Sequence, residues 1–287
     1  MKKLLAYKRL FRIEHAFMLV AAVLLAELLA SRSLSVQLPS LEIILLSLAV
    51  PFFIEMGSFA LNDFWDVKAD TENRRADRPI AAGEITPKKA LAASAVCYAL
   101  GVAAAIPLPT YAFFIAVFFA LFSILYNLKL KDVALLGNAY IAASMAIPFV
   151  FGNIIVSSVP SLPLLAVADV AFVAGLGREI IKTVEDVEGD VLYRKSNTLP
   201  ALVGKPNAIF GAQACYAILS PLSFLPYFLG LPKNTLSLGL VAITAIAFAG
   251  MALEVSKKPT QETFEAARKT SLLALAVGLL GYAASLI

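Results

Sequence analysis

The sequence contains few of the residues that build disulfide networks, metal clusters and charged surfaces. Its 287 residues include two cysteines and a single histidine, His15. Two cysteines exclude a disulfide scaffold or a cysteine-rich metal framework, and one histidine excludes a multi-histidine zinc or iron site. Charged residues make up 15% of the chain, whereas an average soluble domain has roughly 25%. The composition therefore argues against an ordinary soluble domain.

Apolar residues are abundant and occur in long runs. They form 60% of the chain, and the mean hydropathy is +0.82. A membrane-spanning helix needs about 20 mostly apolar residues. We therefore predict an all-α polytopic membrane protein with nine transmembrane helices, whose spans lie near 13–30, 41–62, 88–107, 110–127, 134–156, 162–182, 206–226, 235–253 and 270–287. Pro148, Gly152 and Asn153 fall inside the fifth span and favour an interruption of its helix.

The basic residues gather on one side of these nine spans. If the spans are correct, 22 of the 24 lysines and arginines lie on the side of the N-terminus, and only Arg32 and Lys233 lie on the other. Cytoplasmic loops carry an excess of basic residues. We predict a multi-pass protein of the cell membrane whose N-terminus and long connections are cytoplasmic and whose C-terminus is outside. The net charge of +4 then comes from the cytoplasmic loops of a membrane protein. We therefore expect the lipid bilayer as a partner and no nucleic acid.

Two predicted cytoplasmic segments resemble each other. Residues 66–70 read DVKAD and residues 186–190 read DVEGD, and basic pairs follow both segments at matching distances. The offset of 120 residues contains four spans, so the related parts would have parallel topology. We predict one transmembrane domain, 1–287, composed of related halves at about 1–130 and 131–253 and a ninth helix at 270–287.

The acidic residues of both segments have helical spacing. Asn62, Asp66 and Asp70 are four residues apart, so they share one face if the helix continues. The same spacing joins Lys182 to the two acids of the second segment. Four carboxylates without histidine or cysteine favour a hard cation such as Mg²⁺, which commonly bridges carboxylates to substrate phosphates. The candidate metal ligands are Asn62, Asp66, Asp70, Asp186 and Asp190, and the four aspartates are the candidate catalytic residues.

Basic side chains beside these acids would bind phosphate. Arg74 and Arg78 follow the first segment, and Lys195 follows the second. The alternative is that both segments are ordinary cytoplasmic loops whose mixed charges are only solvated. The occurrence of the same acids and basic pairs in both halves favours the functional interpretation.

The first segment resembles a family motif. Residues 62–70, NDFWDVKAD, match the NDxxDxxxD motif of the UbiA-type intramembrane prenyltransferases, and residues 186–190 are similar to the second motif, DxxxD, of that family. Tyr126-Asn127 with Lys129 and Lys131 match further, and the resemblance covers nearly the whole chain. It implies nine helices around a central cavity with cytoplasmic cap loops. It also implies magnesium-dependent transfer of an isoprenyl group from a prenyl diphosphate, with Lys129 and Lys131 assisting the diphosphate.

Two aromatic residues lie beside the motifs. Tyr126 and Trp65 are candidates for lining the path of the prenyl group, because an allylic cation needs an electron-rich surround. An equally open interpretation is that both residues anchor their helices at the membrane interface.

Residues 178–190, REIIKTVEDVEGD, resemble the archaeal branch of the family, and the DRxDD form of the quinone-pathway members is absent. This resemblance implies a geranylgeranyl diphosphate donor and geranylgeranylglyceryl phosphate as the lipid-phosphate acceptor. Arg12, Arg178 and Lys182 are candidates for binding the acceptor phosphate. Alternatively, Lys182 neutralises Asp186, and Arg178 pairs with Glu55 or Asp169.

Two other functions stay open at this point. A member of the same family could prenylate an aromatic acceptor of a quinone, haem or chlorophyll-type pathway. A secondary transporter would also explain repeated halves with acidic residues, but its charged residues should lie near the middle of the bilayer. Here the acids lie at the predicted cytoplasmic ends of spans, which favours the enzyme.

Overall fold

A computed structural model describes residues 2–72, 75, 77–189 and 197–287. In this part of the chain all regular elements are helices, apart from an isolated bridge between Val133 and Asn197. The chain forms two compact units, Met1–Leu24 with Pro39–Leu130 and Leu25–Leu38 with Lys131–Ile287. The all-α class is confirmed.

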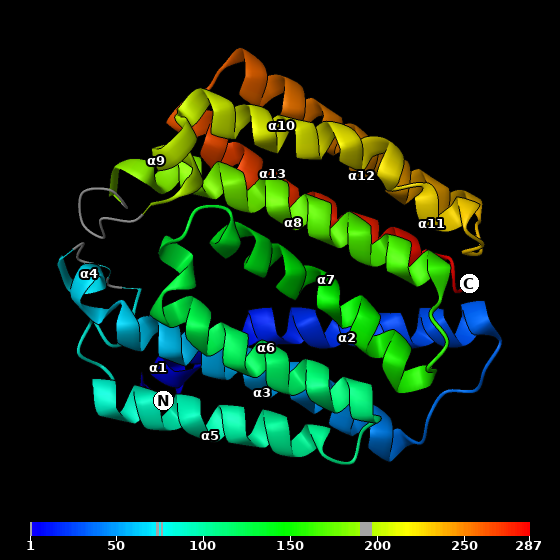
Figure 1. The fold of residues 1–287 in the computed structure, drawn as a ribbon, viewed down its shortest axis with the longest axis horizontal. Helices are drawn as coiled ribbons and strands as arrows, with labels where there is room; N and C mark the ends of the chain where they lie inside the picture. The colour runs from blue at the N-terminus through cyan, green and yellow to red at the C-terminus, as the bar shows by residue number, and fades with distance from the viewer. Residues whose placement is uncertain (1, 73–74, 76, 190–196) are drawn as a thin grey trace. The chain divides into compact units, whose positions relative to one another are not determined.

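The first unit contains α1 (Lys2–Phe11), the first part of α2 (Ile13–Leu34), α3 (Leu41–Trp65), α4 (Val67–Glu72), α5 (Pro87–Ala105) and α6 (Thr110–Leu128). In this unit α1, α4, α5 and α6 pack against α3 (Figure 1), and side chains of α2 contact it at Met56 and Phe52. The Ser40 hydroxyl accepts a hydrogen bond from the backbone N–H of Ile43 and so caps α3. Pro87 starts α5, where its missing N–H costs no helical hydrogen bond.

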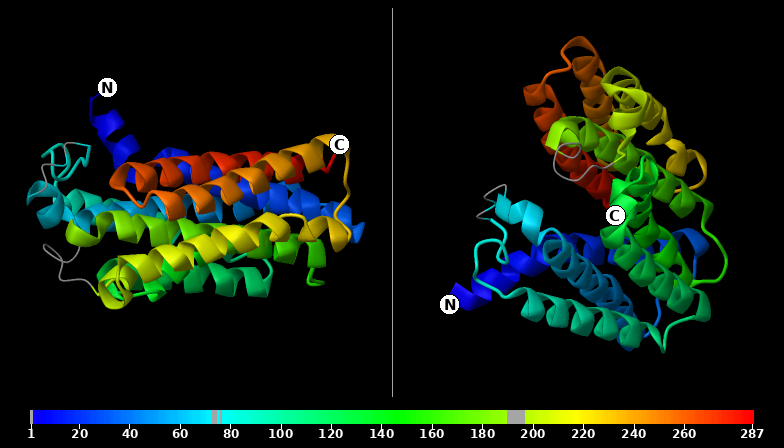
Figure 2. Two further views of the ribbon diagram at one scale, coloured as in Figure 1. Left: turned by 90° about the horizontal axis from the view of Figure 1, so that it is seen from above. Right: turned by 60° about the vertical axis from the view of Figure 1, so that its left-hand side comes forward.

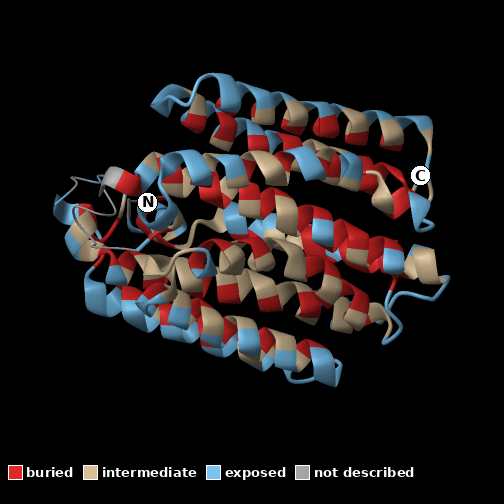
Figure 3. Ribbon diagram, turned by 45° about the horizontal axis from the view of Figure 1, so that its top comes forward, coloured by how far each residue is buried: buried red, intermediate tan, exposed pale blue. Residues whose placement is uncertain are grey.

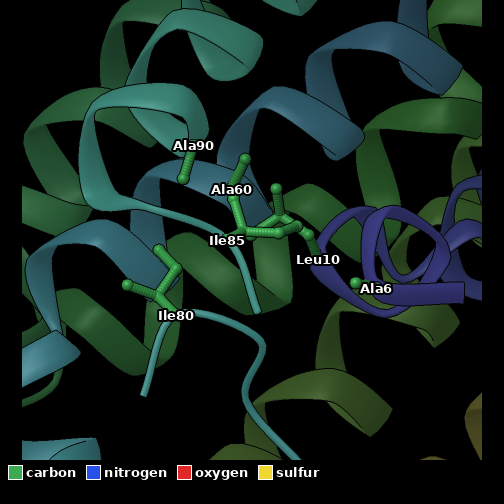
Figure 4. Packing of buried hydrophobic residues seen from close by; sticks show 6 residues of the cluster. All are labelled: Ala6, Leu10, Ala60, Ile80, Ile85 and Ala90. Atoms are coloured by element: carbon green, nitrogen blue, oxygen red, sulfur yellow. The ribbon is translucent and has the colours of Figure 1, made fainter. Parts of the chain in front are cut away.

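A small apolar cluster in the first unit fixes the surroundings of the end of α3 (Figure 4). Its members come from α1, α3, α5 and the connection that precedes α5, and all are almost completely buried: Ala6, Leu10, Ala60, Ile80, Ile85 and Ala90. Burial of this apolar surface is the main force that holds α1 and the connection against α3. The polar residues that follow Ala60 along α3 are thereby placed beside α1 and beside the same connection.

Helices α3 and α5 approach closely at Gly101. A Cβ atom at this glycine would lie 2.7 Å from a side-chain carbon of Ile54 and 3.3 Å from the carbonyl oxygen of Val50. The absence of a side chain at Gly101 is therefore what permits the two helices to pack at this distance.

The second unit contains the end of α2 and the helices that follow α6. These are η1 (Leu130–Asp132) at its boundary, α7 (Leu136–Val156), α8 (Leu162–Gly189), α9 (Leu199–Val203), α10 (Lys205–Leu222), α11 (Leu225–Phe228), α12 (Thr235–Lys257) and α13 (Gln261–Ala284). α8 packs against α7, α10 and α13. α12 and α13 lie side by side (Figure 2). Asn234 and Ser237 form a capping box at the start of α12.

The predicted interruption of the fifth span is wrong. α7 continues through Pro148 to Val156. Asn153 supports the end of this helix, because its side-chain amide donates to the carbonyl oxygens of Ser157 and Val159 and accepts from the N–H of Ser161. From the sequence, Asn153 suggested a break in the helix. In the structure its side chain instead forms hydrogen bonds with backbone groups just beyond the helix end.

Each of the nine predicted spans falls on helical structure, and seven helices of the described chain are long and apolar enough to cross a membrane. The sixth and ninth predicted spans lie in α8 and α13, which are not among the seven, so the count of nine stays a prediction. Exposed residues accompany buried ones along the helices (Figure 3), and many of them are large and apolar, such as Phe114, Phe210 and Ile246. The chain is a multi-pass membrane protein.

We expect Gly101→Ala to lower the thermal unfolding temperature of the detergent-purified protein. The added methyl group must displace Ile54 or separate α3 from α5, and overpacking of this kind costs about 1–3 kcal/mol. Gly250→Ala is the matched control, because nothing lies within 4 Å of its Cβ position. Equal unfolding temperatures for the two variants would contradict the close approach.

Candidate functional site

The first acidic motif lies where α3 ends. α3 ends at Trp65, Asp66 forms a turn, and α4 begins at Val67. The helical hydrogen bonding nevertheless continues, since the N–H of Asp66 donates to the carbonyl of Asn62 at 2.9 Å and the N–H of Asp70 donates to that of Asp66 at 2.8 Å. Asn62, Asp66 and Asp70 therefore keep the successive-turn spacing predicted for them, and both carboxylates are buried.

Asn62 is joined to Asp66 and to α6 by hydrogen bonds. Its Nδ2 donates to Oδ2 of Asp66 and to Oδ1 of Asn127, each at 3.0 Å. Nδ2 of Asn127 in turn donates to the carbonyl oxygens of Ser123 and Ser58. The first motif is thus held by two side-chain amides that connect α3 to α6, of which Asn62 is half-buried and Asn127 is buried.

Asp63, which the sequence analysis did not select, is the most deeply buried acid of the motif. Only 1% of its side chain is exposed, and its Oδ1 accepts from the guanidinium of Arg12 at 2.8 Å and from that of Arg78 at 2.5 Å. Its position one residue beyond Asn62 places it off the face that the four-residue spacing selects. The signal that could have found it is an aspartate inside an apolar run, which needs charged partners.

Arg12 joins the short helix α1 to α2. Its φ of 43° lies in the left-handed region, which is uncommon for a residue other than glycine. The guanidinium lies 4.3 Å from the centre of the Phe59 ring and bonds to Asp63. Burial lowers the pKa of Arg12, and the carboxylates of Asp63, Glu55 and Asp70 oppose this shift. A predicted acceptor-phosphate residue is thus part of the same ion cluster as Arg78.

Arg78 connects two acids of the first motif, Asp63 and Asp70. Its Nε lies 3.9 Å from Oδ2 of Asp70, while its Nη1 bonds to Asp63. The neighbouring Arg75 and Asp77 are exposed and bonded to each other, and the hydrogen bonds from Arg75 lower the pKa of Asp77. Arg74, the other predicted diphosphate residue of this segment, lies outside the described residues.

The remaining candidates near the end of α6 differ in exposure. Lys129 follows α6 and is exposed, and Lys131 belongs to η1 and is half-buried. Tyr126 is half-buried in the last turn of α6. Trp65 is 48% exposed, and its ring contacts the edge of Phe64 at a centroid distance of 5.5 Å. The roles of these four residues stay predictions.

In the second unit, one buried acid contacts both residues of α8 that are predicted to bind the acceptor phosphate. Glu179 is buried, its Oε1 lies 2.6 Å from a guanidinium nitrogen of Arg178, and its Oε2 lies 3.5 Å from Nζ of Lys182. Glu179 is a partner that the sequence analysis did not name for either residue. Three charged groups on adjacent turns of a largely apolar helix have a high desolvation cost, which their pairing offsets in part.

The second acidic motif is described only in part. Asp186 is exposed near the end of α8. The preceding Glu185 bonds to Nε of Arg268 at 2.9 Å, and its carbonyl accepts from Gln261, so the end of α8 is tied to the start of α13. Asp190 and Lys195 lie outside the described residues.

The donor atoms of the first motif suit a hard cation. Asn62, Asp66 and Asp70 offer only amide and carboxylate donors, which magnesium prefers. Within the described ranges, no three histidine, cysteine or acidic side chains are grouped closely enough to hold a metal by themselves. Two buried carboxylates on successive turns still fit magnesium, because this ion is usually bound by one or two carboxylates, waters and substrate phosphates.

These features define a class: a helical, multi-pass membrane protein with buried carboxylates and half-buried arginines at the end of a span. The model of the UbiA prenyltransferase family matches residues 12–281. The chain belongs to this family, and it is a membrane prenyltransferase. The predicted family membership is confirmed.

Relatives and solved structures extend over most of the chain. A protein from Archaeoglobus fulgidus named digeranylgeranylglyceryl phosphate synthase is 34% identical over 276 residues, which cover 95% of this chain and 92% of the relative. A protein of the same name from Methanopyrus kandleri is 32% identical and covers 84% and 87% of the two chains. A solved structure of a digeranylgeranylglyceryl phosphate synthase has a TM-score of 0.81 and 28% identity, with coverage of 100% and 99%.

A more distant structure shares the fold. A UbiA homolog from Archaeoglobus fulgidus, bound to GPP and Mg²⁺, has a TM-score of 0.65 and 18% identity, and the match covers 97% of this chain and 99% of that one.

We expect Asp63→Asn to destabilise the protein strongly. The variant keeps the shape of the side chain but leaves the guanidiniums of Arg12 and Arg78 without their shared carboxylate, and breaking a buried ion pair costs about 3–5 kcal/mol. Thermal unfolding in detergent measures the effect. Asp77→Asn is the control, because this exposed acid also lies near Arg78 and should change stability little. Similar unfolding temperatures for both variants would show that Asp63 does not hold the cluster together.

Proposed function

We propose that the protein transfers a geranylgeranyl group from geranylgeranyl diphosphate to geranylgeranylglyceryl phosphate. The observation that carries this proposal is the identity of 34% over 95% of the chain to a digeranylgeranylglyceryl phosphate synthase. In the reaction the allylic C–O bond of the donor breaks, and diphosphate leaves. The glycerol hydroxyl forms the new ether bond and loses its proton.

Magnesium is the proposed cofactor. Asn62, Asp66 and Asp70 would hold it in the first unit, and Asp186 and Asp190 are the proposed ligands from the second motif. When bound, the ion would neutralise negative charge that develops on the diphosphate as the allylic bond breaks. The distant UbiA homolog is bound to GPP and Mg²⁺, which supports magnesium as the metal and a prenyl diphosphate as the donor.

Arg78 is the proposed diphosphate residue with the clearest support. A guanidinium has five N–H donors, and the contacts to Asp63 and Asp70 orient the group beside Asp70, one of the proposed metal ligands. Arg74, Lys129, Lys131 and Lys195 are further proposed contacts to the diphosphate. The role of Arg78 would be to stabilise the leaving group.

The acceptor phosphate needs cationic partners of its own. Arg12, Arg178 and Lys182 are the proposed residues for it. Arg12 is held at Asp63, and the other two are held at Glu179. A second candidate, prenylation of an aromatic acceptor by the same machinery, would not require a phosphate-binding cluster on α8.

The orientation in the membrane remains part of the proposal. The asymmetry of basic residues supports a cytoplasmic side for the N-terminus and the acidic motifs, and an outer side for the C-terminus. The donor and the acceptor would then be taken from the cytoplasmic leaflet.

A transfer assay with the detergent-purified protein tests the function. Labelled geranylgeranyl diphosphate is offered with and without magnesium, together with geranylgeranylglyceryl phosphate or 4-hydroxybenzoate. We expect magnesium-dependent label in the glycerol lipid alone. Asp66→Ala should abolish turnover because a motif carboxylate is lost, whereas Asp77→Asn should retain it. Label in 4-hydroxybenzoate would overturn the acceptor, and no label in either compound would overturn the proposed reaction.

We expect Arg178→Gln to raise the KM for geranylgeranylglyceryl phosphate at least about tenfold, because a charge-assisted contact to phosphate contributes about 1.5–3 kcal/mol. The KM for geranylgeranyl diphosphate should stay unchanged. Lys269→Gln is the control, since this exposed lysine pairs with Glu265 on the surface of α13. Equal effects on both substrates would contradict an acceptor-specific role.

A further inference from the structure

The amide network around Asn127 fixes which atom of Asn62 faces a ligand. Nδ2 of Asn127 lies 2.9 Å from the carbonyl oxygen of Ser123 and 3.4 Å from that of Ser58. Carbonyl oxygens only accept hydrogen bonds, so this end of the Asn127 side chain must be the NH₂ group. Oδ1 of Asn127 consequently points toward Asn62 as an acceptor.

The orientation of Asn127 determines that of Asn62. Nδ2 of Asn62 uses one hydrogen for Oδ1 of Asn127 and the other for Oδ2 of Asp66. A reversed amide would place Oδ1 of Asn62 against two oxygen atoms and lose both bonds. In the described chain no hydrogen bond is made to Oδ1 of Asn62, so this oxygen is available to bind a cation.

We propose that Asn127 is a positioning residue that fixes the side-chain oxygen of Asn62 as a ligand of the divalent cation. This inference rests on the proposed function, which places the cation at the first motif. Asn127 itself is buried in α6, and among the described residues its side chain bonds to the motif through Asn62. Partners that orient metal ligands in this way typically change metal affinity 10–100-fold when they are removed.

The experiment measures Mn²⁺ binding by electron paramagnetic resonance, with inorganic pyrophosphate present, in the detergent-purified full-length protein. Asn127→Leu should weaken Mn²⁺ binding about tenfold or more, because the Asn62 amide can then rotate. Ser123→Ala is the matched control. Ser123 lies one turn before Asn127 on α6. The variant removes the Ser123 hydroxyl, which contacts Tyr98, but keeps the backbone carbonyl that accepts from Asn127. Its Mn²⁺ affinity should match that of the unaltered protein.

A double-variant cycle separates positioning from a general loss of structure. In an Asn62→Ala background the ligand is absent, so adding Asn127→Leu should not weaken Mn²⁺ binding further. Additive losses, or an unchanged affinity in Asn127→Leu alone, would overturn the proposal. Failure of the unaltered protein to bind Mn²⁺ would overturn both this proposal and the metal site. Normal Mn²⁺ binding without geranylgeranyl transfer would overturn the proposed function only.

Discussion

The carboxylate of Asp63 holds two guanidinium groups at a single oxygen atom, and the architecture at the end of α3 depends on this contact. One arginine comes from the junction of α1 and α2, and the other comes from the connection that precedes α5. Isolated charges at such a depth are costly, so the ion cluster and the apolar cluster around Ala60 must form together. The left-handed backbone of Arg12 is retained because the ion pair and the Phe59 ring fix its side chain.

Two guanidiniums, those of Arg12 and Arg78, offset part of the negative charge of the first motif before any substrate binds. Arg78 lies between Asp63 and Asp70, and the Asn62 amide occupies one oxygen of Asp66. A magnesium diphosphate combines charges of both signs. It would offer a cation to the carboxylates and an anion to the guanidiniums, so binding exchanges partners and leaves no buried charge exposed to apolar surroundings. Under the proposed function, such an exchange would let the site be stable without ligand and still bind a diphosphate.

Sequence patterns predicted the helices and the shared spacing of the first motif, because both depend on local periodicity. They did not predict the role of Asp63, since its partners, Arg12 and Arg78, come from other parts of the chain. A different reason applies at α7, where composition alone marked Asn153 as a helix breaker, whereas its side chain bonds to the backbone of Ser157 and Ser161 just beyond the helix end. Glu179 was missed because the interpretation of α8 relied on the cations and the second motif. The nine-span count, the related halves and the site roles stay predictions.

The central claim is that the buried carboxylates of the first motif bind the metal that carries the diphosphate. The most direct test is a structure determined with Mn²⁺ and a geranylgeranyl thiodiphosphate that cannot react, using the anomalous signal of manganese. The account predicts a manganese peak bonded to the side-chain oxygens of Asn62, Asp66 and Asp70, with the diphosphate contacting Arg78. Manganese bound elsewhere, with these three side chains still bonded only to protein groups, would contradict it.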